Sequence, residues 1–218
     1  MVNNVITIPH GVMRVLNCDW DIDWRSQSAG EGAEGSEQIF LQPFPRWIGT
    51  PQLILHGEAI RLWRATRAKA RGRANVYRVP LLEKSNLPNA YGQADSRGRP
   101  LNGNYGDGPT VPLVNAAAPG ATSIVVTETF HRAGIGRYIS IADWPYLVVD
   151  RQRVGPGSAN WILTIEMPLR RAAAAGATVN LIAHGLFRAR EDTMGNPEVG
   201  LGDVSTPQLS FAEWINRP

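Results

Sequence analysis

Glycine and proline interrupt this sequence so often that long helices and long strands have little room to form. The chain has 22 glycines and 16 prolines among its 218 residues, roughly 17% against a usual sum near 12%. Both residues mark turns and the ends of elements. Hydrophobic residues make up 43%, and no apolar run approaches the roughly 18 residues of a membrane-spanning helix. We therefore predict a soluble, globular protein of short strands and loops, in one large domain or two small ones.

Alternating residues near the N-terminus predict a half-buried strand. Three large apolar side chains fall on one face: Trp20, Ile22 and Trp24. Three carboxylates fall on the other face: Asp19, Asp21 and Asp23. Because successive residues of a strand point to opposite sides of the sheet, this segment should bury its apolar face and present an acidic one.

The two segments that follow should lie outside the interior of a sheet. Residues 26–38 consist mostly of Gly, Ser, Ala and Glu, a composition typical of an exposed loop. Residues 39–48 contain Pro43 and Pro45, and proline cannot donate a hydrogen bond to a neighbouring strand. We therefore expect an exposed loop, followed by an extended edge segment anchored by its aromatic residues.

Residues 57–71 carry the one convincing helical pattern of the chain. The apolar stripe follows a helical spacing and consists of Ile60, Trp63, Arg67 and Ala70. Glu58 near the start and Arg71 near the end complement the helix dipole. Gly72 is the residue expected to end the helix. An alternating segment, 74–80, predicts a strand directly after it.

The last part of the chain is β-rich. It follows a long polar segment, 85–108, which predicts a loop. Five short strands are expected at 121–127, 138–142, 146–151, 161–167 and 178–183. Their spacing favours a small barrel or sandwich.

These patterns predict a mainly β chain with one amphipathic helix. Residues 1–110 should form a β-sandwich domain that includes the helix. Residues 111–190 should form the small barrel or sandwich domain. Residues 191–218 should form a C-terminal tail that docks on the body.

The net charge of +3 hides two segments of opposite charge. Residues 17–37 carry six carboxylates against one arginine, a local charge of −5. Residues 56–78 carry seven cations against one glutamate, a local charge of +6. Candidate contact residues, within one chain or between copies, are Asp19, Asp21, Asp23, Arg61, Arg64, Arg67 and Arg71. Arginine suits interface ion pairs, although a GC-rich genome also enriches it.

Few residues could carry enzymatic chemistry. The single cysteine, Cys18, excludes an intramolecular disulfide and a multi-thiolate metal site, and it is expected to be buried. The four histidines are scattered singly: His10, His56, His131 and His184. Nucleophile-elbow and phosphate-loop motifs are missing from the sequence. We predict no enzyme, no metal and no cofactor.

The N-terminus does not resemble a signal peptide, so we expect assembly in a cytoplasm.

Two binding functions are alternatives. The basic helix, with Trp63 nearby, could contact nucleic-acid phosphates, although an arginine face that meets acidic partners in an oligomer is the favoured interpretation. A carbohydrate-binding module would stack sugars on aromatic side chains of the second domain, and the candidates are Trp144, Tyr146 and Trp161. Core packing is the competing interpretation of these three residues.

The order of short motifs resembles a family of phage proteins. In the first half, a helix is followed by an Arg-Gly-Arg-x-Asn turn into a strand, at Arg71, Gly72, Arg73 and Asn75. Further motifs lie at residues 45–49, 59–65, 136–141, 146–150, 162–170, 176–179 and 185–188. Together they are similar to distal tail proteins and other tail-tip proteins of long-tailed (siphovirus-type) bacteriophages and phage-derived gene transfer particles. The family pattern has Gly-Asp where this chain has Gly136 and Arg137.

The resemblance implies a structural function in the virion tail, with assembly in the bacterial host cytoplasm. A tail-tube-like first domain would be followed by a peripheral β domain. The chain would form a hexameric ring that joins the tail tube protein to the tail-tip hub protein and the host-recognition apparatus. DNA would only pass through the lumen, and no membrane is involved. Another tail-tip hub or tail-completion subunit is the alternative within this class. A ring needs two complementary surfaces on each subunit, which the oppositely charged segments would supply.

Overall fold

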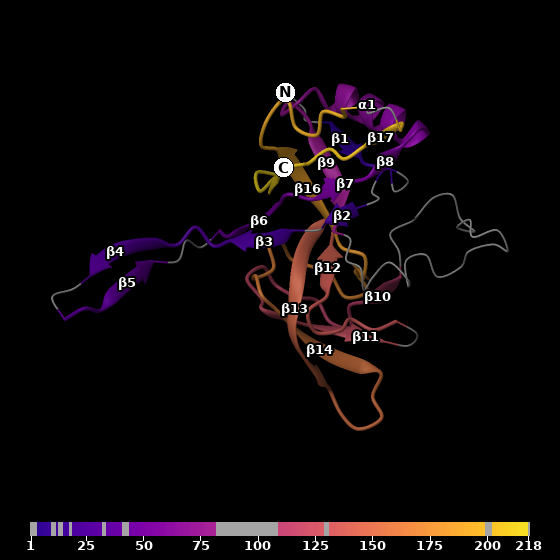
Figure 1. The fold of residues 1–218 in the computed structure, drawn as a ribbon. Helices are drawn as coiled ribbons and strands as arrows, with labels where there is room; N and C mark the ends of the chain where they lie inside the picture. The colour runs from indigo at the N-terminus through magenta and orange to yellow at the C-terminus, as the bar shows by residue number, and fades with distance from the viewer. Residues whose placement is uncertain are drawn as a thin grey trace. The chain divides into compact units, whose positions relative to one another are not determined.

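The computed structural model describes residues 4–9, 12, 15–17, 19–31, 34–40, 44–81, 109–128, 131–198 and 202–217. Within them the fold is mainly β, with 45% strand and 8% helix, and the single helix is α1 (Figure 1). The prediction of a mainly β fold with one amphipathic helix is confirmed. In this part of the chain, no helix is long and apolar enough to cross a membrane. Cys18, His10 and the predicted loop 85–108 lie outside the described residues.

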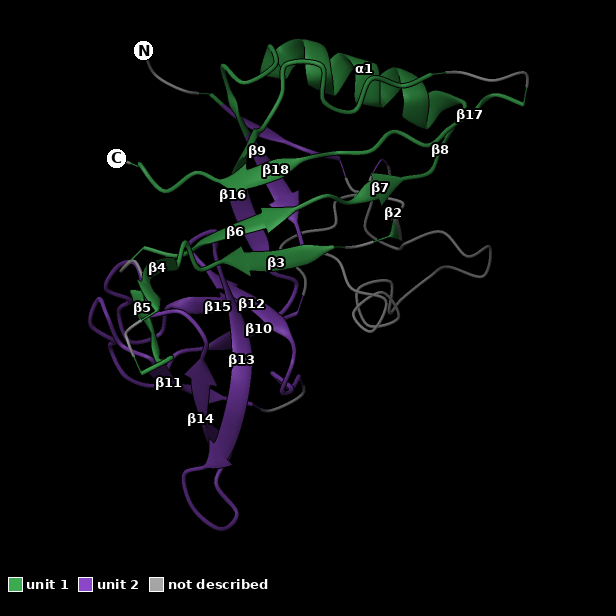
Figure 2. Ribbon diagram, turned by 60° about the vertical axis from the view of Figure 1, so that its left-hand side comes forward, with its two compact units in different colours: residues 1–4, 14–76, 187–218 green, residues 5–13, 77–186 purple. Residues whose placement is uncertain are grey.

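Two compact units make up the chain, and neither is continuous in sequence. Unit 1 comprises residues 1–4, 14–76 and 187–218, and unit 2 comprises residues 5–13 and 77–186 (Figure 2). The expected blocks 1–110, 111–190 and 191–218 therefore do not coincide with the compact units. The C-terminal residues belong to unit 1, where they supply a strand to its main sheet.

The main sheet of unit 1 is antiparallel, in the order β16-β18-β6-β3. Its strands are residues 187–189 of β16 (His184–Ala189), β18 (Phe211–Glu213), β6 (Arg46–Gly49) and β3 (Trp20–Asp23). Gly49 lies opposite both Trp20 and Phe211, and a Cβ at Gly49 would collide with the Trp20 ring. The glycine therefore leaves room for the indole. Trp20, Phe187 and Phe211 pack with ring centroids 4.9 to 6.3 Å apart.

Short paired strands and a hairpin complete the β structure of unit 1. Strand β2 (Val15–Asn17) pairs with β7 (Gln52–Leu53), and β8 (Leu55–His56) pairs with β17 (Val204–Ser205). Strands β4 (Gln27–Glu31) and β5 (Glu37–Phe40) form an antiparallel hairpin. All three pairs are antiparallel, and each forms a separate two-stranded sheet.

Three expectations for this region are wrong. The expected loop 26–38 contains most of the β4–β5 hairpin. The expected edge segment 39–48 contains β6, which lies between β18 and β3; Pro45 only precedes the strand, so it interrupts no hydrogen bonds within it. The apolar face of β3 is buried at Trp20 and Ile22, as predicted, but Trp24 follows the strand and is 37% exposed.

Helix α1 (Glu58–Ala70) forms where the spacing predicts it. Its buried face consists of Ile60, Trp63, Thr66 and Ala70. Trp63 Nε1 donates a hydrogen bond to the Gly195 carbonyl at 2.7 Å. Arg71 takes the left-handed conformation that ends the helix, with φ 51°, one position before the expected Gly72. Gly72 is left-handed too, and a Cβ there would meet Asp192.

Unit 2 contains a closed β-barrel. Its strands are β10 (Thr110–Pro112), β11 (Ser123–Thr127), β12 (Tyr138–Ile141), β13 (Trp144–Arg153), β14 (Asn160–Ile165) and β15 (Thr178–Asn180). The strand order is β10-β15-β12-β13-β14-β11. Just after β10, Leu113 forms a bridge with Val126 of β11, and the Val114 N–H donates to the Val125 carbonyl at 2.8 Å. The first and last strands of the sheet therefore meet, which closes the barrel.

The barrel core follows the alternation of its strands. Side chains no more than 2% exposed include Ile124, Val126, Ile139, Tyr146, Val148, Leu163, Ile165 and Val179. The predicted strands form close to their expected positions, whereas β10 and β16 were not expected from the sequence. Unit 2 also contains β1 (Val5–Thr7), which lies beside β9 (Val76–Pro80), the strand predicted after the helix.

Candidate interaction surfaces

The three acidic residues of the first candidate surface lie along β3, and two of them have partners in unit 1. Asp23 Oδ2 forms an ion pair with Arg46 Nε at 3.1 Å. The Thr50 hydroxyl donates to Asp19 Oδ2 at 2.9 Å. Asp21 is exposed and accepts a hydrogen bond from the Ile22 N–H. The acidic face exists as predicted, but its charge is partly neutralised within the unit.

The basic candidates on α1 divide into two groups. Arg61, Arg64 and Arg71 are exposed. Arg67 instead holds the segment 193–196: its guanidinium donates to the carbonyls of Met194 and Thr193 at 2.8 and 3.2 Å and to Asn196 Oδ1 at 2.9 Å. The assignment of Arg67 to a contact surface is therefore corrected, because its hydrogen bonds serve the fold of unit 1. We call the other three residues the basic helix face.

The β4–β5 hairpin is the most exposed element of unit 1. Figure 1 shows it extending well beyond β3 and β6, the strands that precede and follow it in the sequence. Every described residue from 27 to 40 is exposed. Ile39 and Phe40 are 59% and 60% exposed, and Phe44, just after the hairpin, is 60% exposed. We call residues 27–40 the arm.

The arm is acidic as well as apolar. Its charged residues are Glu31, Glu34 and Glu37, and the sequence has no Lys or Arg between Arg25 and Arg46. Glu31 lies directly opposite Glu37 across the two strands, and like charges in such a pair destabilise a hairpin. An isolated two-stranded hairpin is only marginally stable in water. On its own, the arm therefore has repulsion between its two opposed glutamates and leaves its apolar side chains exposed to water.

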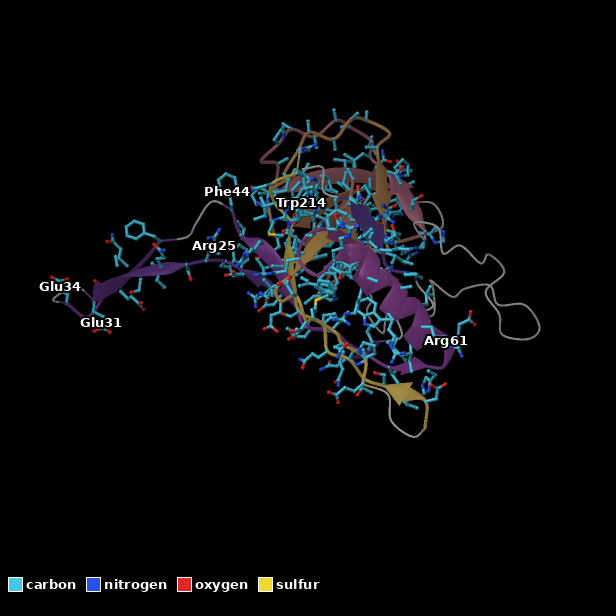
Figure 3. All side chains as sticks on the ribbon, turned by 90° about the horizontal axis from the view of Figure 1, so that it is seen from above. Arg25, Glu31, Glu34, Phe44, Arg61 and Trp214 are labelled. Carbon is cyan, nitrogen blue, oxygen red and sulfur yellow. The ribbon has the colours of Figure 1, made fainter. Side chains whose placement is uncertain are left out.

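The arm and the basic helix face lie on opposite sides of unit 1. In Figure 3, Glu31 and Glu34 lie at the far end of the arm, while Arg61 lies at the other side of the unit on α1. Arg25 and Phe44 lie near the base of the arm in the same view. The acidic end of the arm therefore cannot reach the basic helix face of its own copy.

The aromatic candidates of unit 2 do not form an open sugar-binding surface. Trp144 and Tyr146 are only 5% and 1% exposed, and the Tyr146 hydroxyl accepts a hydrogen bond from the Arg170 N–H at 3.1 Å. Trp161 is half-buried, and the guanidinium of Arg151 lies 3.9 Å from its ring centroid. The carbohydrate assignment of these residues is corrected, since two rings are packed in the interior and cations flank the third.

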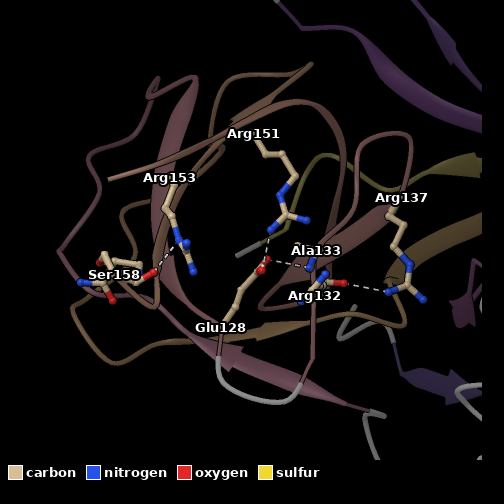
Figure 4. A network of polar contacts seen from close by, with 8 residues as sticks. Glu128, Arg132, Ala133, Arg137, Arg151, Arg153 and Ser158 are labelled. Carbon is tan, nitrogen blue, oxygen red and sulfur yellow. Dashed lines mark hydrogen bonds and ion pairs between the residues drawn. The ribbon is translucent and has the colours of Figure 1, made fainter. Parts of the chain in front are cut away.

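Unit 2 also contains a polar network that the sequence did not predict (Figure 4). Glu128, whose side chain is 3% exposed, binds Arg151 Nη2 at 2.7 Å and accepts the Ala133 N–H at 2.8 Å. Arg137 donates to the Arg132 carbonyl, also at 2.8 Å.

The network continues past the Trp161 ring, because the Arg153 guanidinium lies 5.3 Å from the ring centroid and donates to the Ser158 carbonyl at 2.8 Å. We call Arg132, Arg137, Arg151 and Arg153 the arginine row. The alternation of Arg151 and Arg153 on one strand was the available signal in the sequence.

Three of the four histidines of the chain lie among the described residues. His184 is buried, whereas His56 and His131 are exposed and far apart in the sequence. Among the described residues, no three His, Cys, Asp or Glu side chains are grouped so as to hold a metal ion. The Arg73 N–H donates to Asp192 at 3.0 Å, and this hydrogen bond holds the pKa of Asp192 below its ordinary value.

Two hollows open on the surface, one in each unit. One, of about 460 Å³, is lined by residues of the segments 196–198 and 204–208 in unit 1. The other, of about 390 Å³, lies in unit 2 and includes the ion pair of Arg78 with Asp143 at 2.8 Å. Asn180 also lines it, but the Asn180 side-chain oxygen is shielded from solvent and has no hydrogen-bond partner.

The sequence matches no known protein family and no curated protein.

Proposed function

We propose that the chain is a non-enzymatic structural subunit that assembles with copies of itself into a ring at the tip of a phage-type tail. The observation that carries the proposal is the arm, an exposed acidic and apolar hairpin that its own unit leaves uncovered. The phage tail setting comes from the sequence resemblance. The motifs that carry this resemblance fall in or next to β6, α1, β9, β12, β13, β14, β15 and β16.

The arm needs an apolar partner. Burying a large apolar side chain contributes about 1.5 to 3 kcal/mol, and the arm and its base offer Ile39, Phe40 and Phe44. Docking would also complete the hydrogen bonding of exposed strand edges. These gains offset the repulsion within the hairpin, so the arm is stable when another molecule covers it.

A second copy of this chain supplies the complementary charge. The arm carries three glutamates, and the basic helix face carries three arginines. Because the two surfaces lie on opposite sides of unit 1 (Figure 3), they pair between copies and not within one. Such a head-to-tail interface generates a closed ring or an open filament, depending on the rotation between copies.

In this proposal the acidic partner is the arm, not the β3 strand suggested by sequence alone. Asp19 and Asp23 already accept contacts from Thr50 and Arg46. The ring would contain six copies and contact the tail tube protein and the hub protein, as the resemblance implies. DNA would pass through the lumen, and the site of action would be the virion tail.

Light scattering coupled to size-exclusion chromatography tests the proposal. We expect a discrete species at a multiple of the 23.8 kDa chain mass, with six copies as the value implied by the family. Phe40→Ser should shift the protein toward the monomer. Ile135→Ser is the matched control, because Ile135 in unit 2 is also 60% exposed but lies outside the arm. A monomer at high concentration would contradict the proposal.

Ring size separates the alternatives within the same class. Negative-stain microscopy of the purified assembly should show closed rings with a central opening. A tail-completion subunit or a hub subunit of different symmetry would show another copy number. Open filaments would be consistent with the contact between the arm and the basic helix face, but they would contradict the closed ring.

A further inference from the structure

The arginine row of unit 2 is a second charged surface, and the ring proposal does not use it. Its members come from the segment before β12 and from β13: Arg132, Arg137, Arg151 and Arg153. Arg137 donates a hydrogen bond to the Arg132 carbonyl. Arg151 donates to Glu128, which also accepts the Ala133 N–H. The guanidiniums of Arg151 and Arg153 both lie over the Trp161 ring. Figure 4 shows these guanidinium groups distributed across one region of the barrel.

The row presents positive charge to solvent. Its one carboxylate, Glu128, is buried, with a side chain 3% exposed, and both of its oxygens accept hydrogen bonds. Asp150 is exposed on β13 but alternates with Arg151 and so projects from the other face of the strand. Arg132 and Arg153 are exposed, and Arg137 and Arg151 are half-buried.

The row is also held in place before any ligand arrives. The Arg153 Nε–H is fixed by the Ser158 carbonyl, and Arg151 is fixed by Glu128 on one side and the Trp161 ring on the other. A guanidinium has five donors, so one or two internal hydrogen bonds leave Arg153 able to bind a planar oxyanion. Side chains that are already ordered lose less conformational entropy on binding.

The chemistry of the row selects the class of ligand. Several guanidiniums along one surface suit a polymer with repeated anionic groups better than a single ion. Single-stranded nucleic acid binds through bases stacked on open aromatic rings, but guanidiniums flank the Trp161 ring. Affinity for a DNA duplex comes largely from neutralising many phosphates along the helix, and this row offers only four guanidiniums.

We infer that the arginine row is a binding site for an anionic polysaccharide, recognised through its carboxylate or phosphate groups and not through stacking of sugar rings. The site lies entirely in unit 2. It does not depend on the ring, and it differs from the aromatic carbohydrate surface that the burial of Trp144 and Tyr146 excludes.

Fluorescence anisotropy with the full-length protein tests this inference. The probe is labelled polygalacturonate, which carries a carboxylate on each repeat, and labelled dextran is the neutral control. We expect polygalacturonate to bind and dextran not to bind. Binding should weaken steeply between about 50 and 200 mM salt.

Paired substitutions locate the site. Arg132→Gln with Arg153→Gln removes two exposed cations and leaves the buried Glu128–Arg151 pair intact; it should reduce the affinity at least about tenfold. Lys69→Gln with Arg190→Gln removes the same charge from two exposed positions of unit 1 that lie outside the basic helix face, and should leave the affinity unchanged. A thermal melt of each variant checks that its fold is retained.

Three results would overturn the inference. They are failure of polygalacturonate to bind at low salt, equal loss of affinity in the two double variants, or tighter binding of a short DNA duplex than of the polysaccharide. None of these results depends on the mass of the assembly, so the ring proposal and the polysaccharide site can fail separately.

Discussion

The chain contains two hairpins that differ in what stabilises them. In the β13–β14 hairpin, Val148, Leu163 and Ile165 face the barrel core and are at most 2% exposed. In the arm, every described residue is exposed, and Glu31 lies opposite Glu37. Both are antiparallel ladders, so strand pairing alone does not distinguish them. Burial within its own unit stabilises β13–β14, whereas the described residues of the arm are exposed, which is why we propose that a partner molecule covers it.

The largest expected effect is a core truncation in the β13–β14 hairpin. Leu163→Ala should destabilise unit 2 by about 2 to 5 kcal/mol, because a fully buried side chain leaves a cavity. Phe40→Ala in the arm should change the stability of the dilute monomer by less than about 0.5 kcal/mol. Chemical denaturation at low protein concentration measures both. Equal losses would show that the arm is packed within its own copy, contrary to this account.

A second prediction concerns the strands that carry the arm. Gly49→Ala should destabilise unit 1 by about 1 to 3 kcal/mol, because the added Cβ would collide with the Trp20 ring. Gly35→Ala is the control within the arm, where a Cβ would meet nothing within 4 Å. It should cost only about 1 kcal/mol, from its left-handed backbone. Thermal melts compare the two, and a larger loss for Gly35→Ala would contradict the packing described for Gly49.

Removing the like-charge pair should have opposite effects on the arm and on the assembly. Glu31→Gln with Glu37→Gln should stabilise the isolated hairpin by about 0.2 to 1 kcal/mol. It should weaken self-association about fivefold, because attraction to the basic helix face is lost. Sedimentation at several protein concentrations measures the association. Stronger association of the variant would show that the acidic residues do not meet a basic partner.

The smallest expected effect is a pH dependence at the end of α1. The Arg73 N–H lowers the pKa of Asp192 in the folded state, so the stability from this contact is present above the unfolded pKa. It is lost as the pH falls through the folded pKa, below about pH 4. Asp192→Asn should flatten this part of the stability profile. Because the Asp192 carboxylate is exposed, the change in stability should be small. If the stability of Asp192→Asn falls at acid pH just as that of the parent protein does, the Asp192 contact contributes nothing to the profile.

The regular elements could be predicted because their apolar residues recur at the spacing of a helix or of a strand. Helix α1 has Ile60, Trp63 and Ala70 at helical spacing, and the barrel strands alternate apolar residues. The arm could not be predicted, since a ribbon of Gly, Ser, Ala and Glu has no apolar alternation. Its strands are defined by backbone pairing only. The composition did predict its exposure.

The candidate surfaces were predictable to a smaller extent. Sequence separates acidic from basic segments, but it does not show that Arg67 donates to the carbonyls of Met194 and Thr193. Trp144 and Tyr146 share one strand face, and only the closed barrel shows that this face is buried. The arginine row brings together segments whose proximity depends on the turn before β12.

Hydrogen exchange of the arm amides, measured across a range of protein concentrations, shows whether another copy covers the arm. We expect fast exchange of residues 27–40 in the dilute monomer, because an exposed ribbon opens readily. Protection should appear as the protein assembles, while the amides of β13 and β14 stay protected at every concentration. An arm that exchanges equally fast in the assembled protein, or is already protected in the monomer, would contradict the account.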